Sequence, residues 1–370
     1  MILKTILSGK HYQFKSVKDV MAKANEEKSG DTLAGIAAHN MQERVAAKVV
    51  LSRLTLNDVY EHPAVDYDHD EVTRMIIDDL DPLVFRQIKG WTFEQLREWL
   101  LATTTTNDMI HYLSQGLTSE MIAGVCKLMT NLDLIIAAKK IVNEKTANTT
   151  IGRPGTFSSR LQPNHPTDNL HGIMASTMEG LSMGIGDAVI GLNPVNDTVS
   201  GVTAILNTFN EFVTRWQVPT QTCVLAHVTT QMQAIEDGAP AGLIFQSIAG
   251  SQKANTAFGI DQHLIAQANQ LGKQALQNKG QNVMYFETGQ GSELSSDANF
   301  GADQVTMEAR CYGFARHFDP FIVNTVVGFI GPEYLYDAKQ VTRAGLEDHF
   351  MGKLSGLAMG CDVCYTNHMK

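Results

Sequence analysis

Polar and ionisable residues recur where short apolar runs end in the second part of this 370-residue chain. In chain order they are Arg160, Gln162, Asn193, His227, Gln246, Ser247, Glu287, Asn324 and Asp362. Two of them are carboxylates, which pair with an ammonium group, and the guanidinium of Arg160 can hold a hydroxyl oxygen. Together these side chains would form a bowl that suits a small, polar, cationic ligand.

A metal centre is the alternative interpretation, because His227, Glu287 and Asp362 are all ligand types for a divalent ion. No second histidine lies close to His227 in the sequence, and the first apolar run contains no His-x-His pair. The spacing therefore favours an organic ligand and no metal site. A metal-dependent barrel hydrolase stays open as the alternative function.

The composition argues against several other classes of protein. A net charge of −10 does not fit a nucleic-acid-binding protein, which shows a basic face. The sequence has no run of about 18 apolar residues, so no membrane span is expected. Five cysteines, an odd number in a long chain, argue against a secreted disulfide framework and favour a reducing cytosol.

The elements that must position the polar residues alternate between two patterns. Segments such as Ile205–Trp216 and Leu264–Ala275 have apolar residues three or four apart, which places them on one helix face. Seven short apolar runs predict strands: Thr156–Gln162, Asp187–Asn193, Cys223–Val228, Gly242–Ser247, Val283–Thr288, Ile322–Phe329 and Gly356–Asp362. Strands and helices in alternation predict a parallel sheet with crossover helices.

Both an open sheet and a closed barrel fit this alternation. An open sheet concentrates its ligand contacts at one switch point, whereas a barrel builds its site from the ends of several strands. Polar residues at nearly every strand end favour the barrel. We therefore predict an α/β fold with a TIM (β/α)8-type barrel at residues 151–370, in which seven strands are visible and the last βα unit is absent.

Residues 1–150 are predicted to form an N-terminal helical region. Val17–Glu27 and Met41–Leu54 have helical composition, and no alternating strand pattern is found. Thr118 or Ser119 is placed to cap one helix, and Asn131 is placed to begin the next.

Long segments resemble the large, catalytic subunits of ethanolamine ammonia-lyases. One such segment begins Tyr285-Phe-Glu-Thr-Gly-Gln-Gly291 and continues through Ala298–Arg310. The others are Ala147–Pro163, Gly186–Pro194, Val224–Gln231, Gly242–Ser247, Asp319–Tyr336 and Ala344–Gly356. The resemblance covers essentially the whole chain, and it implies a TIM barrel with an N-terminal helical region.

The resemblance also implies an activity and a set of site residues. These enzymes use adenosylcobalamin to convert ethanolamine into acetaldehyde and ammonia by radical chemistry. Arg160 and Asn193 would hold the substrate hydroxyl, and Gln162, Glu287 and Asp362 would hold its amino group, with Arg160, Glu287 and Asp362 as the catalytic residues. The residues expected at the cobalamin are Pro194, Gln246, Ser247, Ser295, Val326 and Phe329.

Partners and location follow from the same resemblance. It implies a small subunit that completes the cobalamin site, a higher hetero-oligomer, and a cytoplasmic location, often inside a bacterial microcompartment. The family's large subunit continues past the end of this chain and would supply the eighth strand. A shortened, non-catalytic chain that only binds a partner subunit is therefore a further alternative.

Overall fold

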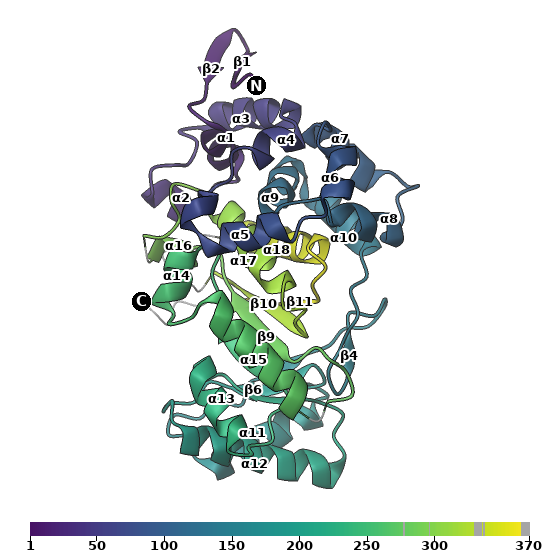
Figure 1. The fold of residues 1–370 in the computed structure, drawn as a ribbon, viewed down its shortest axis with the longest axis vertical. Coiled ribbons are helices and arrows are strands. Elements are labelled where there is room, and N and C mark those ends of the chain that lie inside the picture. The colour runs from purple at the N-terminus through teal and green to yellow at the C-terminus, as the bar shows by residue number, and fades with distance from the viewer. Residues whose placement is uncertain (277, 296, 329–334, 336, 364–370) are drawn as a thin grey trace.

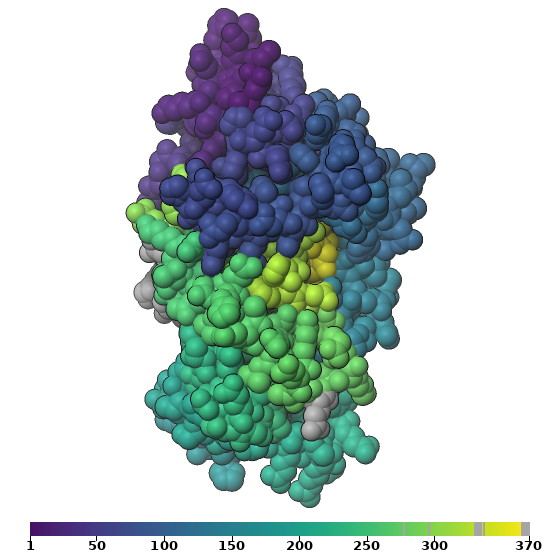
Figure 2. Space-filling view, in the orientation of Figure 1, coloured from purple at the N-terminus to yellow at the C-terminus, as the bar shows by residue number. Residues whose placement is uncertain are grey.

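The computed structural model describes residues 1–276, 278–295, 297–328, 335 and 337–363. The chain begins with an antiparallel hairpin of β1 (Lys4–Leu7) and β2 (Lys10–Gln13), which projects from the molecule in Figures 1 and 2. Its turn places Ser8 and Gly9 at φ 49° and 77°, the left-handed region that two-residue hairpin turns use. The prediction of a helical N-terminal region missed this hairpin, because its strands are too short to show clear alternation.

Helices make up most of the remaining N-terminal region. The α9 helix (Ser119–Leu128) begins after Thr118, whose hydroxyl accepts a hydrogen bond from Met121 N, and α10 (Asn131–Lys140) is capped by Thr130. Both predicted helix starts are therefore confirmed. The other elements are α1 (Val17–Ala24), α2 (Ser29–Leu33), α3 (Met41–Arg53), α4 (Leu56–Tyr60), the 3-10 turn η1 (Tyr67–His69), α5 (Glu71–Asp78), α6 (Pro82–Ile88), α7 (Phe93–Leu101) and α8 (Asn107–Ser114).

Seven parallel strands follow in the described part of the chain, at the positions of the seven predicted runs. They are β5 (Arg160–Leu161), β6 (Val189–Leu192), β7 (Thr222–Val224), β8 (Ile244–Ser247), β9 (Met284–Thr288), β10 (Ile322–Val327) and β11 (Met359–Val363). They form two sheets, β5-β6-β7 and β8-β9-β10-β11. Gly242 N and Leu243 N, just before β8, both donate to Thr222 O on β7 at 2.8 and 3.1 Å. The strands thus lie side by side in chain order.

Helices connect the strands, as the alternating pattern predicts. They are α11 (Leu170–Ser182), α12 (Val199–Trp216), α13 (Val228–Glu236), α14 (Gln252–Ala257), α15 (Gln262–Ala275), α16 (Ser292–Ser295), α17 (Gln304–Arg316) and α18 (Ala338–Leu354). In Figure 1, α11, α12 and α13 lie at one end of the molecule, the N-terminal helices lie at the other, and β9, β10 and β11 lie between them. No helix in the described residues is both long and apolar enough to cross a membrane.

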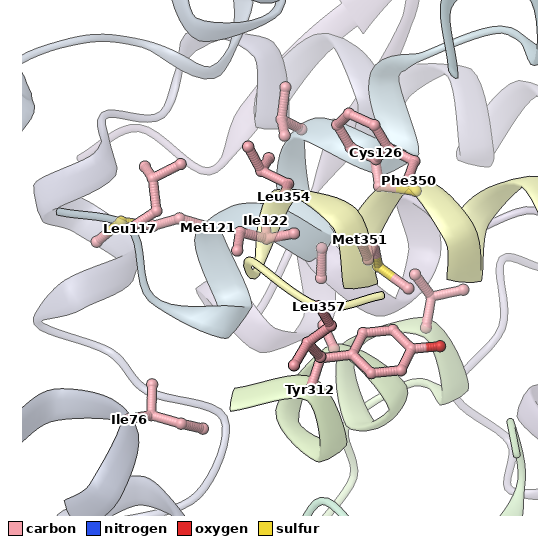
Figure 3. Close-up of a cluster of buried hydrophobic side chains, with 14 of the residues drawn as sticks. Ile76, Leu117, Met121, Ile122, Cys126, Tyr312, Phe350, Met351, Leu354 and Leu357 are labelled. Atoms are coloured by element: carbon pink, nitrogen blue, oxygen red, sulfur yellow. The ribbon is translucent and has the colours of Figure 1, made fainter. Parts of the chain in front are cut away.

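Alternate residues of each strand face opposite sides. On one side, Phe245 and Tyr285 belong to an apolar cluster with Cys223 and Leu225. On the other side, β8, β9 and β10 pack against helices that include the N-terminal ones. Figure 3 shows part of this second core, where side chains of α9, α17 and α18 meet. The N-terminal helices therefore share a core with the strand–helix part.

Buried ion pairs also join the N-terminal helices to α17. Arg310 on α17 is fully buried, and its guanidinium donates to Glu120 Oε1 at 2.5 Å and to Asp70 Oδ2 at 2.7 Å. A second hairpin, β3 (Lys145–Thr146) and β4 (Thr150–Ile151), links the two regions along the chain. The predicted division at residue 150 falls inside this hairpin, and the two-domain organisation stays a prediction.

Candidate active site

Arg160 lies at the centre of a polar cluster built from several strands. Its Nη1 donates to the Tyr285 hydroxyl and to Glu287 Oε1. Its Nη2 donates to Gln162 Oε1 at 2.7 Å and to Asp362 Oδ2. One guanidinium thereby joins β5 to β9 and β11, and it brings together side chains from three separate parts of the sequence.

Strand geometry explains why these side chains converge. Tyr285 and Glu287 are two residues apart on β9 and so point to the same side. Asn324 on β10 lies in register with Glu287, and its amide donates to Glu287 Oε1 at 3.4 Å and to Asp362 Oδ2 at 3.1 Å. A side-chain carbon at Gly360 would come within 2.8 Å of Asn324 Oδ1, so the glycine leaves room for this amide.

Each carboxylate has one oxygen engaged and one oxygen open. Glu287 Oε1 accepts from Tyr285 at 2.6 Å as well as from Arg160 and Asn324. Asp362 Oδ2 accepts from Arg160 and Asn324. Among the described residues, Glu287 Oε2 and Asp362 Oδ1 have no hydrogen-bond partner. The cluster therefore presents two free acceptor oxygens, as binding of an ammonium group requires.

The charges in the cluster do not balance. One guanidinium and two carboxylates leave a net charge of −1, and the three side chains are only 13%, 16% and 30% exposed for Arg160, Glu287 and Asp362. Burial alone would lower the pKa of Arg160, but Tyr285, Glu287 and Asp362 outweigh it and hold that pKa above its ordinary value. Arg160 therefore stays charged, and a bound monocation would complete the neutralisation.

Gln162, predicted to hold the amino group, is hydrogen-bonded to Arg160. The two predicted hydroxyl partners, Arg160 and Asn193, are not hydrogen-bonded to each other among the described residues. Asn193 is exposed just after β6, where its backbone N–H donates to Asn164 Oδ1 at 2.9 Å. Its side chain is not bonded to the Arg160 cluster among the described residues. Pro194 follows and is half-buried.

The residues expected at the cofactor occupy different faces. Ser247 lies in register with Glu287, and Val326 lies in register with Asp362, so both face the polar cluster. Gln246 points to the helix side of β8, where its amide accepts from Val228 N and donates to Ser247 O, both at 3.0 Å. Phe329 and the side chain of Ser295 lie outside the described residues.

Tyr285 is the site residue that sequence reasoning missed. The signal was present, because a residue two positions before Glu287 on one strand must share its face. The sequence analysis included Tyr285 only as part of the apolar run Val283–Thr288 and gave it no role. Asn324 was recognised as a polar strand end, but the sequence suggested no role for it.

The metal interpretation finds no support in the geometry. His227 caps α13, and its ring nitrogens lie 2.8 Å from Thr229 Oγ1 and 3.1 Å from Phe258 O. Within the described ranges, no three histidine, cysteine or acidic side chains are grouped so that they could hold a metal ion. His227 thus has a structural role that is separate from Glu287 and Asp362.

Comparison with known proteins agrees with the geometry. Residues 12–370 match the family model described as "Ethanolamine ammonia lyase large subunit (EutB)". The ethanolamine ammonia-lyase large subunits of Escherichia coli strain K12 and of Salmonella typhimurium strain LT2 are each 58% identical to this chain over 368 residues. Each alignment covers 100% of this chain and 81% of the relative. The chain therefore belongs to the ethanolamine ammonia-lyase large subunit family.

Proposed function

We propose that this chain is the catalytic subunit of an enzyme that converts ethanolamine into acetaldehyde and ammonia. The observation that carries the proposal is the pair of carboxylates around Arg160, each with one oxygen that has no hydrogen-bond partner among the described residues. Ethanolamine carries one ammonium group and one hydroxyl, two carbons apart. Its single positive charge matches the net charge of −1 in the cluster.

The substrate would be held at both ends. Its ammonium group donates to Glu287 Oε2 and Asp362 Oδ1, with Gln162 beside it. Arg160 and Asn193 hold the hydroxyl oxygen. Arg160 is released toward the hydroxyl when the ammonium takes over the neutralisation of the two carboxylates. Glu287, Arg160 and Asp362 are thus the proposed catalytic residues, because the two carboxylates keep the amino group oriented and Arg160 holds the hydroxyl end while the bond from nitrogen to carbon breaks.

We further propose that adenosylcobalamin binds over the carboxyl ends of the strands. Ser247 and Val326 fit this proposal, since they face the same side as Glu287 and Asp362. Pro194, Gln246, Ser295 and Phe329 complete the proposed set of cofactor residues, in which Gln246 acts indirectly by accepting a hydrogen bond from Val228 N at the start of α13. When bound, the cofactor supplies the radical that removes a hydrogen atom from the hydroxyl-bearing carbon.

The proposed architecture is a TIM (β/α)8-type barrel at residues 151–370 with an N-terminal helical region at residues 1–150. The chain-order arrangement of β5 to β11 supports it, as does the contact of Arg160 on β5 with Asp362 on β11. A flat sheet would hold its first and last strands far apart. In an eight-stranded barrel the first and seventh strands are separated only by the eighth, and their inward side chains share one narrow interior.

The names of the relatives support a partner as well. A large subunit implies a small subunit, which we propose completes the cobalamin site within a higher hetero-oligomer. A cytoplasmic location, often within a protein-shelled microcompartment, is part of the same proposal.

Co-expression with a small subunit tests the function. Acetaldehyde should form only when adenosylcobalamin and ethanolamine are both present, together with an electron paramagnetic resonance signal. Glu287→Gln should raise KM for ethanolamine by about tenfold or more, since a hydrogen bond to a charged group is lost. Glu211→Gln on the exposed face of α12 is the matched control. Unchanged kinetics of Glu287→Gln would remove Glu287 from the site, and no product from the wild-type complex would overturn the function.

A further inference from the structure

Tyr285 lies between an apolar cluster, which includes Phe245, and the polar cluster around Arg160. Its ring is fully buried and packs edge-on against Phe245, with 5.2 Å between the ring centroids. Cys223 and Leu225 belong to the same apolar cluster. The hydroxyl group is the polar end of a side chain that is otherwise fixed by packing, so its position is well defined.

The Tyr285 hydroxyl bridges Arg160 and Glu287, two of the three proposed catalytic residues. It accepts a hydrogen bond from Arg160 Nη1 and donates one to Glu287 Oε1 at 2.6 Å. Burial and the neighbouring Glu287 raise the pKa of Tyr285 well above its ordinary value, so the hydroxyl keeps its proton. The direction of both hydrogen bonds is therefore fixed: Arg160 donates to Tyr285, and Tyr285 donates to Glu287.

We propose that Tyr285 is a positioning residue that holds Glu287 Oε1 and so turns Glu287 Oε2 toward the amino group of the substrate. The proposal rests on the proposed function and deepens it. Glu287 could otherwise rotate about its terminal bond and offer both oxygens to Arg160 as a bidentate pair. Such a pair would leave no acceptor free for the ammonium group.

The same hydroxyl limits how strongly Arg160 binds Glu287. Arg160 Nη1 carries two N–H groups and donates to both the Tyr285 hydroxyl and Glu287 Oε1. An N–H group that Tyr285 accepts is not available for a second hydrogen bond to Glu287, so the ion pair that the substrate must open is not doubled. Tyr285 thereby leaves Glu287 Oε2 available to the ammonium group of the substrate. It also leaves the Arg160 guanidinium able to move to the hydroxyl oxygen of the substrate.

The first test is Tyr285→Phe in the complex with the small subunit and adenosylcobalamin. Phenylalanine keeps the packing against Phe245 and removes only the hydroxyl. KM for ethanolamine should rise about tenfold, with a smaller change in kcat and no change in cofactor affinity. Tyr60→Phe is the matched control, because the Tyr60 ring packs on Phe85 among the N-terminal helices.

A double-mutant cycle separates positioning from a general packing effect. If Tyr285 acts through Glu287, the double variant Tyr285→Phe with Glu287→Gln should be no worse than Glu287→Gln alone. Independent losses that multiply in the double variant would overturn the proposal. An unchanged KM in Tyr285→Phe would overturn it as well.

Calorimetric titration of ethanolamine into the same complexes separates this proposal from the function on which it rests. Wild-type binding with weakened binding in Tyr285→Phe supports the positioning role even where turnover is slow. Equal binding by both proteins contradicts the role of Tyr285 and leaves the proposed function standing. No binding and no turnover by the wild-type complex contradicts both.

Discussion

Arg160 on β5 and Asp362 on β11 form an ion pair although they lie 202 positions apart in the sequence. These two strands are the first and the last of the parallel series in the described residues. Their side chains can meet only if the series curves so that its two ends approach each other. The contact therefore does two things, since it supports the proposed barrel and it assembles the candidate active site.

Arg160→Lys should abolish most of the activity while the positive charge is kept. Lysine offers one compact ammonium group, whereas Arg160 uses two separate nitrogens to reach four side chains. We expect kcat/KM for ethanolamine to fall by about ten- to a hundredfold, as for loss of one or two charge-assisted hydrogen bonds. Arg215→Lys on the exposed face of α12 is the control. Activity within twofold of the wild type would show that charge alone suffices at this position.

Asn324→Leu should lower kcat/KM for ethanolamine without changing the charge of the site. The Asn324 amide donates to both Glu287 Oε1 and Asp362 Oδ2 and so holds the two carboxylates together despite their repulsion. Leucine has nearly the same shape and donates nothing. We expect kcat/KM to fall by about tenfold, measured as acetaldehyde formation, with Asn207→Leu on exposed α12 as control. Equal losses in both variants would point to a general effect on folding.

The sequence alone predicted the elements better than the contacts. The seven strands were predictable because each is a short apolar run that ends in polar residues, and α9 and α10 were predictable from their caps. The pairing of Arg160 with Glu287 and Asp362 was not. Sequence reasoning assigned Arg160 to a hydroxyl, because it could not show that this guanidinium is the cation nearest to two half-buried carboxylates. Tyr285 was missed for a related reason, since its ring is core while its hydroxyl is part of the site.

Arg310→Met should destabilise the junction between the N-terminal helices and α17. The guanidinium of Arg310 also donates to Gly250 O and to Thr73 Oγ1 at 2.8 and 2.7 Å. Removing it leaves Asp70 and Glu120 buried without their cation, which costs about 3–5 kcal/mol in buried pairs. Urea unfolding followed by circular dichroism should show this loss, and Arg215→Met serves as the surface control. An unchanged midpoint would mean that the two carboxylates find other partners.

Glu308 and Asp348 form a second buried acidic pair, on the helix side of β9 and β10. Glu308 Oε1 accepts from Thr288, and Asp348 Oδ2 accepts from Thr325 at 2.8 Å. Both carboxyl groups belong to fully buried residues. Burial and the neighbouring Asp348 raise the pKa of Glu308 well above its ordinary value of 4.5, and burial raises the pKa of Asp348 to about 7. The folded protein therefore keeps protons on this pair that the unfolded chain releases.

The sign of the pH dependence follows from that difference. From about pH 4.5 upward through neutral pH, the folded state binds more protons than the unfolded state, so the free energy of unfolding decreases as the pH rises. Glu308→Gln mimics the protonated acid and removes its titration. The decrease between pH 5 and pH 8 should be smaller in this variant, by up to about 1.4 kcal/mol per pH unit. Urea unfolding at several pH values measures the difference, and Glu211→Gln should follow the wild-type curve. A Glu308→Gln curve parallel to that of the wild type would show that Glu308 is ionised in the folded protein.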